Sequence, residues 1–238
     1  PHMLNSLSNK KILVVVAHPD DEVLGLGATI NRLISQQENV VKAVILGEGI
    51  TSRSKERNID EWKSELELHH SNTLKAAAVI GYHGIRTYNF PDNRFDSVDL
   101  LEIIKVIEKE KSEFKPDVIF THHGGDVNID HQKTFEAVIT ACRPLENETV
   151  KTIITFETMS GTEWRASTDP RHFIPNLFFS VEKSNLDAKI KAMESYEYEK
   201  REYPHPRSPQ ALKIRAQMWG VSIGVNFAEA FCLVRSIK

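Results

Sequence analysis

A histidine and three carboxylates follow the first apolar run of the chain. The segment HPDDE at 18–22 comes directly after the run at 11–17. His18 and Asp21 are three positions apart, close enough in a tight turn for both side chains to face one point, as metal ligands do. Acidic residues also cap helices and complement the helix dipole, which would explain the carboxylates but gives no role to His18.

A second group of potential ligands follows the later apolar run PDVIF. It occupies residues 121–131 and ends on Asp130 and His131. If both runs are parallel strands, their carboxyl ends lie at one edge of the sheet and bring the two groups together. His18, Asp21 and His131 would then offer two nitrogens and one oxygen, with a fourth position open to water, which is typical of catalytic zinc. Asp130 would pair with His131 and orient it.

The elements that would position these residues alternate along the chain. β-branched and aromatic runs predict strands, and apolar residues at helical spacing predict helices between them. The predicted strands are 11–17, 40–46, 85–90, 116–121, 151–157, 176–182 and a closing strand around 230–234. The predicted helices are one starting near residue 21, 59–74, 100–114, one around 135–139, 186–200 and 208–221. This alternation predicts right-handed crossovers and a mainly parallel sheet with helices on both faces.

The length and the start of the chain bear on its domain organisation. At about 100–200 residues per domain, 238 residues suit a single α/β domain. Pro1 and His2 ahead of Met3 resemble a tag remnant. We therefore expect a flexible lead-in over 1–9 and one folded domain over 10–238.

Composition excludes several classes of protein. The net charge is −3, and the Lys and Arg residues are mixed with Asp and Glu, so we expect no nucleic-acid partner. No apolar run approaches the roughly 20 residues of a membrane helix, and no signal segment opens the chain, so we expect a cytoplasmic protein without a membrane span. The two cysteines lie outside any CxxC pattern, which argues against a disulfide framework and a cysteine zinc site.

Motifs placed after successive predicted strands resemble a known family. AHPDDE (17–22), GEGITSR (47–53), FPDNR (90–94) and NIDH (128–131) are similar to motifs of the LmbE-like, or PIG-L-like, N-deacetylases. YPHPRSP (203–209) and AEAF (228–231) are similar to the sugar-acting branch, so the resemblance spans the chain. It implies a Rossmann-like three-layer fold, a homo-oligomer and bound Zn²⁺, or another divalent metal. The implied reaction is removal of an N-acetyl group from a small amino sugar or amino-sugar conjugate.

The resemblance also implies roles for individual residues. His18, Asp21 and His131 match the zinc ligands, and Asp20 matches the general base. Zinc lowers the pKa of a bound water toward about 7, and an adjacent carboxylate can take its proton during attack on an amide carbonyl. The same carboxylate can return that proton to the poor amine leaving group.

Four further residues are candidates for contact with substrate. Arg53 matches an arginine that contacts substrate in the resembled family, and Asp92 matches an acidic position that binds sugar hydroxyls. Asn128 departs from the family, where a histidine is frequent. Because asparagine donates hydrogen bonds but cannot act as an acid, Asn128 would bind a hydroxyl or the developing oxyanion. His205, in the HPR turn, is the candidate for assisting the oxyanion. Solvated loops and ordinary turns are the structural alternatives for these positions.

Other polar residues receive less specific assignments. The polar segment at 160–175 is expected to form a surface loop at the rim of the site. One of His122 and His123 could face the pocket. Surface or packing positions suit His69, His70, His83 and His172.

Three other functions fit parts of the pattern. The nearest is a zinc hydrolase of another acyl substrate, an O-acetyl ester or a non-sugar amide. A metal-binding protein without activity would have no need of Asp20 beside the ligands. A non-hydrolytic nucleotide-binding module would use Gly25 and Gly27, but these lie beyond the turn that follows the strand, and the carboxylates at 18–22 would repel phosphates. The glycines are expected instead to let the first helix lie close to the sheet.

Overall fold

The structure, a computed structural model, describes residues 7–238. These residues form a seven-stranded sheet. The strands are β1 (Lys11–Val16), β2 (Val40–Gly47), β3 (Gly84–Phe90), β4 (Val118–His122), β5 (Thr152–Phe156), β6 (Leu177–Ser180) and β7 (Ala228–Ser236). Their order is β3-β2-β1-β4-β5-β7-β6. The strands β1 to β5 pair in parallel, and β7 is antiparallel to both of its neighbours. The mainly parallel sheet is therefore confirmed.

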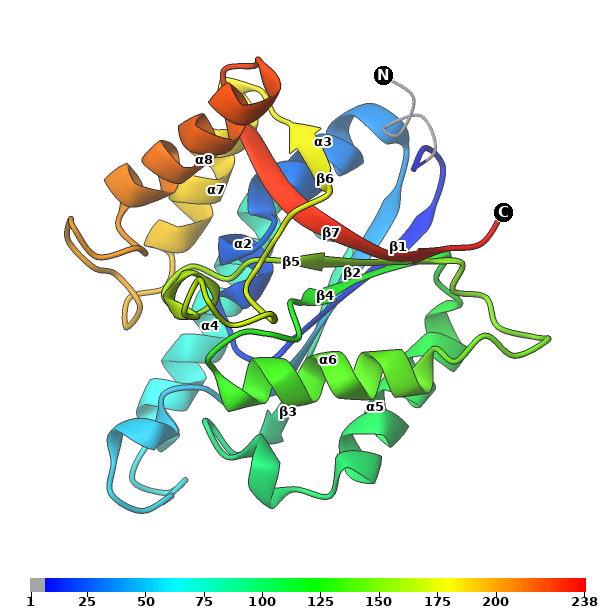
Figure 1. Ribbon diagram of the computed structural model, residues 1–238. Coiled ribbons are helices and arrows are strands. Elements are labelled where there is room, and N and C mark those ends of the chain that lie inside the picture. Colours follow the sequence, from blue (N-terminus) through cyan, green and yellow to red (C-terminus); the bar gives the residue numbers. More distant parts are fainter. Residues whose placement is uncertain (1–6) are drawn as a thin grey trace.

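Helices cover both faces of the sheet (Figure 1). They are α2 (Asp21–Leu24), α3 (Gly27–Gln37), α4 (Lys63–Ile80), α5 (Leu100–Phe114), α6 (Ile129–Ala141), α7 (Lys183–Glu194) and α8 (Pro209–Ile223). One face carries α5 and α6, and the other carries the remaining helices. Alternate residues of β1 belong to two cores: Val14 lies in the same core cluster as Ile30 of α3, and Val15 in the same one as Ile107 of α5. This burial on both faces explains why β1 is a continuous apolar run.

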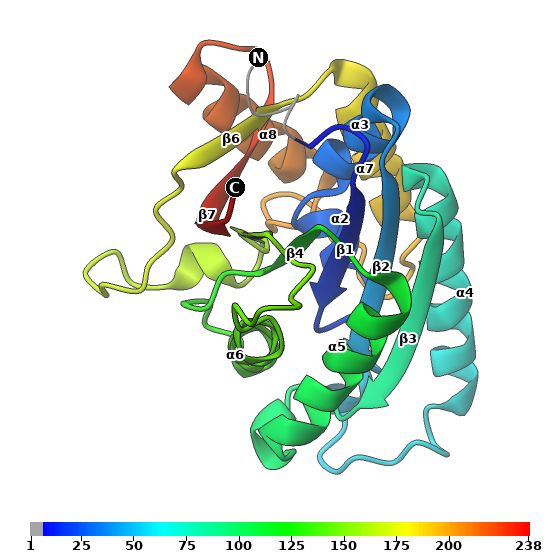
Figure 2. The same cartoon turned by 90° about the vertical axis from the view of Figure 1, so that its right-hand side faces the viewer.

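Parallel pairing places the loops after β1, β2, β3 and β4 at one edge of the sheet (Figure 2). All the motifs that resemble the deacetylase family before residue 150 belong to these loops. In sheets of this class, ligands bind outside the carboxyl ends of the strands. The fold thus brings together motifs that are far apart in sequence.

Some elements differ from their predicted bounds. The predicted helix at 186–200 is shorter, since α7 ends at Glu194 and residues 195–208 form an irregular loop. The predicted closing strand is longer, because β7 pairs with both β5 and β6. Residues 1–6 of the predicted lead-in lie outside the described residues, and Leu7 is buried against the core. None of the helices described is both long enough and apolar enough to cross a bilayer.

Gly25, between α2 and α3, lies against the buried ring of Phe156 in β5. A Cβ at this position would lie 2.2 Å from Phe156 Cδ2, so the glycine allows the close approach of helix and sheet that the sequence predicts. Gly25→Ala is expected to lower the free energy of unfolding by about 1–3 kcal/mol, because the ring cannot move within a packed core.

Gly84→Ala is the matched control for that substitution. Its Cβ would lie 3.7 Å from the flexible Lys42 side chain, so we expect a change within about 0.5 kcal/mol. Urea unfolding of both variants measures the difference. Equal losses of stability would show that the contact with Phe156 is not the cause.

Candidate active site

The three predicted metal ligands lie together at the carboxyl ends of β1 and β4. His18 is in the loop after β1, Asp21 begins α2, and His131 is in the first turn of α6. Asp21 Oδ2 is 3.4 Å from His18 Nδ1 and 3.3 Å from His131 Nε2. One potential ligand atom of each residue lies within 4.8 Å of the other two. This separation is suitable for binding a single metal ion.

His131 shows that the residues fit a metal. Its side chain is buried, and within the described part of the chain neither ring nitrogen makes a well-aligned hydrogen bond, although carboxylate oxygens of Asp21 and Asp126 lie 3.3 Å from Nε2 and 3.1 Å from Nδ1. A divalent ion bound at Nε2 would satisfy this nitrogen, and two imidazole nitrogens with one carboxylate oxygen are a ligand set that zinc accepts.

Further carboxylates lie behind the two histidines. Asp130 Oδ2 is 2.8 Å from His18 Nε2, and Asp126 Oδ2 is 3.1 Å from His131 Nδ1. The predicted pairing of Asp130 with His131 is therefore wrong, because adjacent residues on a helix point about 100° apart and Asp130 faces the neighbouring loops. It also accepts hydrogen bonds from the backbone N–H groups of Asn93 and Phe95. A carboxylate behind each imidazole fixes the ring orientation, as is usual for metal ligands.

The electrostatics of this cluster favour a positive charge at its centre. Burial lowers the pKa of His131, but Asp21 and Asp126 more than offset it and raise the pKa to about 9. Burial raises the pKa of Asp21, but His131 and His122 bring it well below its usual range. A proton or a metal ion can supply the charge that these carboxylates stabilise.

Asp20 lies beside the ligand cluster in a constrained conformation. Its φ is 104°, a region that non-glycine residues rarely adopt and that is concentrated at functional sites. Its Oδ2 accepts a hydrogen bond from Arg207 Nη1 at 3.0 Å, whereas Oδ1 has no partner among the described residues. Burial raises the pKa of Asp20, and Arg207 opposes that rise. One carboxylate oxygen is therefore held while the other stays free.

Glu22, the third carboxylate of the motif, supports the backbone of Asp20. Its Oε2 accepts a hydrogen bond from the Asp20 N–H at 3.0 Å. The hydroxyl of Tyr196 donates to Oε1, and burial raises the pKa of Glu22 to about 7. Glu22 is fully buried, so it stabilises the turn at Asp20 from the interior of the protein.

A pocket of about 310 Å³ opens above the cluster, and its volume lies within the range of small-molecule sites. It contains the predicted base and every predicted substrate contact, which are Asp20, Arg53, Asp92, Asn128 and His205, together with His18. The segment predicted to form the rim contributes Ser160 and Trp164. Residues as far apart in the sequence as His18 and Arg207 thus share one cavity.

The predicted substrate contacts have defined partners. Arg53 Nη2 is 2.6 Å from Glu199 Oε1, and Asp92 Oδ2 accepts from the backbone N–H of Ser52. Asn128 caps α6, since its Oδ1 accepts from the Asp130 N–H and its Nδ2 donates to Asn93.

His205 is oriented by the turn that contains it. Its Nδ1 accepts the backbone N–H of Arg207 at 3.1 Å, so in the neutral ring Nε2 carries the proton. Burial and the nearby Arg207 and Arg201 lower the pKa of His205, which favours the neutral ring. The imidazole can therefore donate a hydrogen bond within the pocket.

Sequence reasoning missed several residues of the site. Arg207 lies in the YPHPRSP motif, but the neighbouring sequence does not predict its ion pairs with Asp20 and Glu199. His69, assigned to a surface or packing position, is buried and also lines the pocket. One of His122 and His123 was expected to face the pocket, but neither is among the residues that line it. The ring centroid of His122 lies 3.8 Å from that of His131, and its Nε2 accepts the Ala17 N–H, so His122 packs against the ligand cluster from the interior.

Sequence comparison finds relatives among deacetylases. Residues 13–142 match the PIG-L family model, described as GlcNAc-PI de-N-acetylase, and this range is more than half of the chain. The uncharacterized deacetylase YaiS of Escherichia coli (strain K12) is 29% identical over 200 residues, which cover 82% of this chain and 95% of YaiS.

Structural comparison finds the same fold in several solved structures. N,N′-diacetylchitobiose deacetylase from Pyrococcus horikoshii has a TM-score of 0.73 at 19% identity, over 95% of this chain and 85% of the other. The 4-carboxy-2-hydroxymuconate hydratase GalB from Pseudomonas putida KT2440 has a TM-score of 0.73 at 17% identity, over 96% and 98%. Because a deacetylase and a hydratase share this fold, the reaction must be argued from the site.

Proposed function

Because this chain belongs to the PIG-L family, whose model describes a GlcNAc-PI de-N-acetylase, we propose that it is a zinc-dependent N-deacetylase of an amino sugar or amino-sugar conjugate. The observation that carries the proposal is the shared pocket. A potential metal site, a carboxylate with one free oxygen and several hydrogen-bonding side chains converge there. Metal-dependent amide hydrolysis uses these three components together.

The residues of the chain account for the movement of protons. When bound by His18, Asp21 and His131, a zinc ion would supply the Lewis acid that activates water and polarises the acetamide carbonyl. Asp20 accepts the proton of the attacking water and returns it to the amide nitrogen as the C–N bond breaks. The products are acetate and the free amine. Arg207 holds Oδ2 of Asp20, so the proton moves at Oδ1.

The remaining residues bind and orient the substrate. Arg53, Asp92 and Asn128 supply donors and acceptors for sugar hydroxyls. The Nε2–H of His205 donates to the carbonyl oxygen as negative charge develops there, which stabilises the transition state more than the ground state. Asp130 and Asp126 act through the histidines that they orient.

Arg207→Gln tests the positioning of Asp20. Without the contact at Oδ2, the carboxylate loses its orientation, and kcat is expected to fall about tenfold to a hundredfold, because small misplacements of catalytic groups have large effects. Metal content and KM should change little. Arg171→Gln, at an exposed arginine, is the matched control. An unchanged kcat in Arg207→Gln would remove the arginine from this role.

The choice of substrate class is tested by acetate release from a panel of acetylated compounds. Zinc-loaded protein is incubated with N-acetylglucosamine, N,N′-diacetylchitobiose, p-nitrophenyl acetate and an N-acetyl amino acid. Turnover of the N-acetyl sugars with the highest kcat/KM supports the proposal. Preference for the ester or the amino acid would favour hydrolysis of another acyl group, and no acetate from fully loaded protein would overturn the deacetylase assignment.

A further inference from the structure

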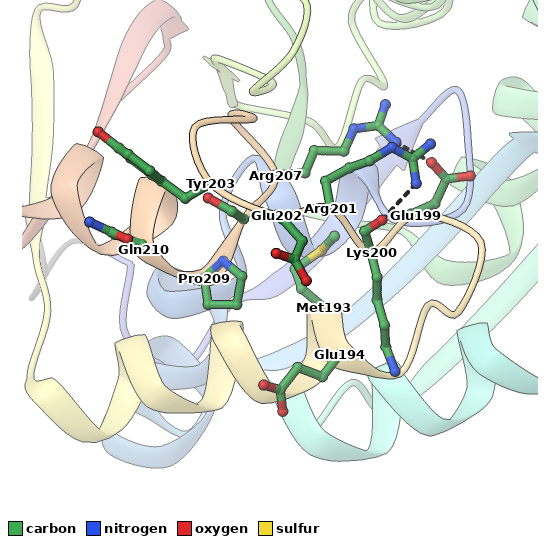
Figure 3. Close-up of a pocket in the computed structure, with 11 residues that line it drawn as sticks. Met193, Glu194, Glu199, Lys200, Arg201, Glu202, Tyr203, Arg207, Pro209 and Gln210 are labelled. Atoms are coloured by element: carbon green, nitrogen blue, oxygen red, sulfur yellow. Dashed lines mark hydrogen bonds and ion pairs between the residues drawn. The ribbon is translucent and has the colours of Figure 1, made fainter.

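Glu199 is a buried carboxylate in the loop that joins α7 to α8. The five residues that follow it, 200–204, are exposed, whereas Glu199 is only 7% exposed. Figure 3 shows its side chain beside the guanidinium of Arg207, while the adjacent Lys200 points away from that group. Glutamate is rarely buried unless it is paired. The partners of Glu199 therefore account for its position.

Each carboxylate oxygen of Glu199 pairs with a different arginine. Oε1 is 2.6 Å from Arg53 Nη2, and Oε2 accepts a hydrogen bond from Arg207 Nη1. Both arginines line the pocket that contains Asp20. Arg53 lies 146 positions away in the loop after β2, whereas Arg207 lies in the same loop as Glu199. Glu199 thus joins the arginine expected to contact substrate to the arginine that contacts Asp20.

Three side chains hold the guanidinium of Arg207. Its Nη1 donates to Asp20 Oδ2 at 3.0 Å and also to Glu199. Its Nε donates to Ser160 Oγ at 2.7 Å. Arginine commonly binds a carboxylate through two nitrogens and both oxygens. Because Ser160 and Glu199 occupy two of its N–H groups, Arg207 bonds only one oxygen of Asp20. Oδ1 is therefore left for the proton of the proposed reaction.

Arg53 is held by the same loop as Arg207. Besides its contact with Glu199, Nη2 donates to the carbonyl oxygen of Tyr198 at 3.2 Å. Within residues 7–238, Nε and Nη1 of Arg53 make no hydrogen bond. One edge of the guanidinium is thus fixed, and the other can bind substrate. A long side chain that is already held loses less conformational freedom when a ligand binds.

We propose that Glu199 is a positioning residue for both substrate binding and proton transfer. Through Arg53 it prepares the pocket for the substrate, and through Arg207 it keeps one oxygen of Asp20 free. It acts through the two arginines rather than on the reacting atoms. The inference rests on the proposed function, in which Asp20 is the base and Arg53 binds the sugar.

Glu199→Gln is expected to lower kcat for N-acetyl sugar hydrolysis about tenfold and to raise KM about tenfold. The amide is uncharged and has one oxygen, so it cannot accept hydrogen bonds from both arginines at separate oxygens. Arg207 can then turn and bind both oxygens of Asp20, which removes the free one. Steady-state acetate release measures both constants. Glu197→Gln, at an exposed position in the same loop, is the matched control.

Double variants separate this role from a general loss of structure. If Glu199 affects kcat through Arg207, adding Glu199→Gln to Arg207→Gln should not lower kcat further. If it affects KM through Arg53, adding Glu199→Gln to Arg53→Gln should not raise KM further. Effects that multiply in either pair would overturn the inference. So would kinetic constants for Glu199→Gln that equal those of Glu197→Gln.

Glu199→Asp provides a second test that holds even if Glu199→Gln does not fold. It keeps the negative charge but shortens the side chain by a methylene, so the carboxylate cannot reach both arginines in their present positions. We expect kcat to fall or KM to rise as in Glu199→Gln. Wild-type values of both constants would contradict a bridge between the arginines.

Calorimetry on zinc-loaded Asp20→Asn protein separates this inference from the proposed function. Binding of N-acetylglucosamine is expected to weaken about tenfold with either Arg53→Gln or Glu199→Gln, and no further with both. This result without acetate release from wild-type protein would support the role of Glu199 in binding and overturn the deacetylase proposal. Acetate release from wild-type protein with unchanged affinity in Glu199→Gln would overturn only the inference. No binding of the sugar and no acetate release would contradict both.

Discussion

Asp20→Asn is expected to lower kcat for N-acetyl sugar hydrolysis by about 10²–10⁴-fold while leaving the bound metal in place. Asparagine has nearly the same shape and tolerates positive φ, so the turn at 104° can persist. It cannot accept the proton of the attacking water or return it to the amine. The measurement pairs steady-state acetate release with elemental analysis of zinc in the same preparation.

Asp60→Asn, at an exposed position outside the site, is the matched control and should behave as wild type. Substantial kcat in the zinc-loaded Asp20→Asn variant would exclude Asp20 as the base. Loss of zinc together with activity would instead place Asp20 among the residues that support the metal site.

His131→Ala is expected to abolish stoichiometric zinc binding and to reduce acetate release to the level of chelator-treated protein. The substitution removes one of three potential ligands and leaves Asp21 and Asp126 without their shared partner. We expect zinc affinity to fall more than about 100-fold, because changes to the residues behind ligands alone cost about 10–100-fold. Zinc titration followed by thermal unfolding measures this loss, since zinc stabilises only a chain that binds it.

Two further variants test whether the loss of zinc affinity is specific to the predicted ligands. Asp126 contacts the predicted ligands through His131, so Asp126→Asn should weaken zinc binding by about 10–100-fold. His70→Ala, at an exposed position on α4, should leave affinity unchanged. Full zinc occupancy in His131→Ala would contradict the ligand assignment, and the alternative group formed by His18, Asp92 and Asp130 would then become the candidate.

The sequence predicted the fold and the convergence of the site because both depend on local patterns. The continuous apolar run of β1 indicates a strand buried on both faces, and parallel pairing then brings the loops after β1 and β4 together. His18, Asp21 and His131 could be placed near one another from this topology alone. The close approach of the first helix to the sheet was predicted from its glycines, and the structure places Gly25 against Phe156, but the division of that helix into α2 and α3 was not predicted.

The partners within the site could not be predicted, because they depend on side-chain directions and contacts far apart in sequence. Asp130 follows the cap of α6 and precedes His131, yet it bonds His18 across 112 positions. The contact of Arg207 with Asp20 spans 187 positions and crosses from the loop before α8 to the loop after β1. No periodicity or motif spacing contains this information.

Titration of metal-free protein with Zn²⁺, with acetate release from N,N′-diacetylchitobiose followed at each step, tests the central claim most directly. If His18, Asp21 and His131 hold the ion that the reaction requires, activity rises from the background and reaches a plateau near one ion per chain. Acetate release that does not depend on the metal, or complete zinc binding without acetate release, would contradict a zinc-dependent deacetylase.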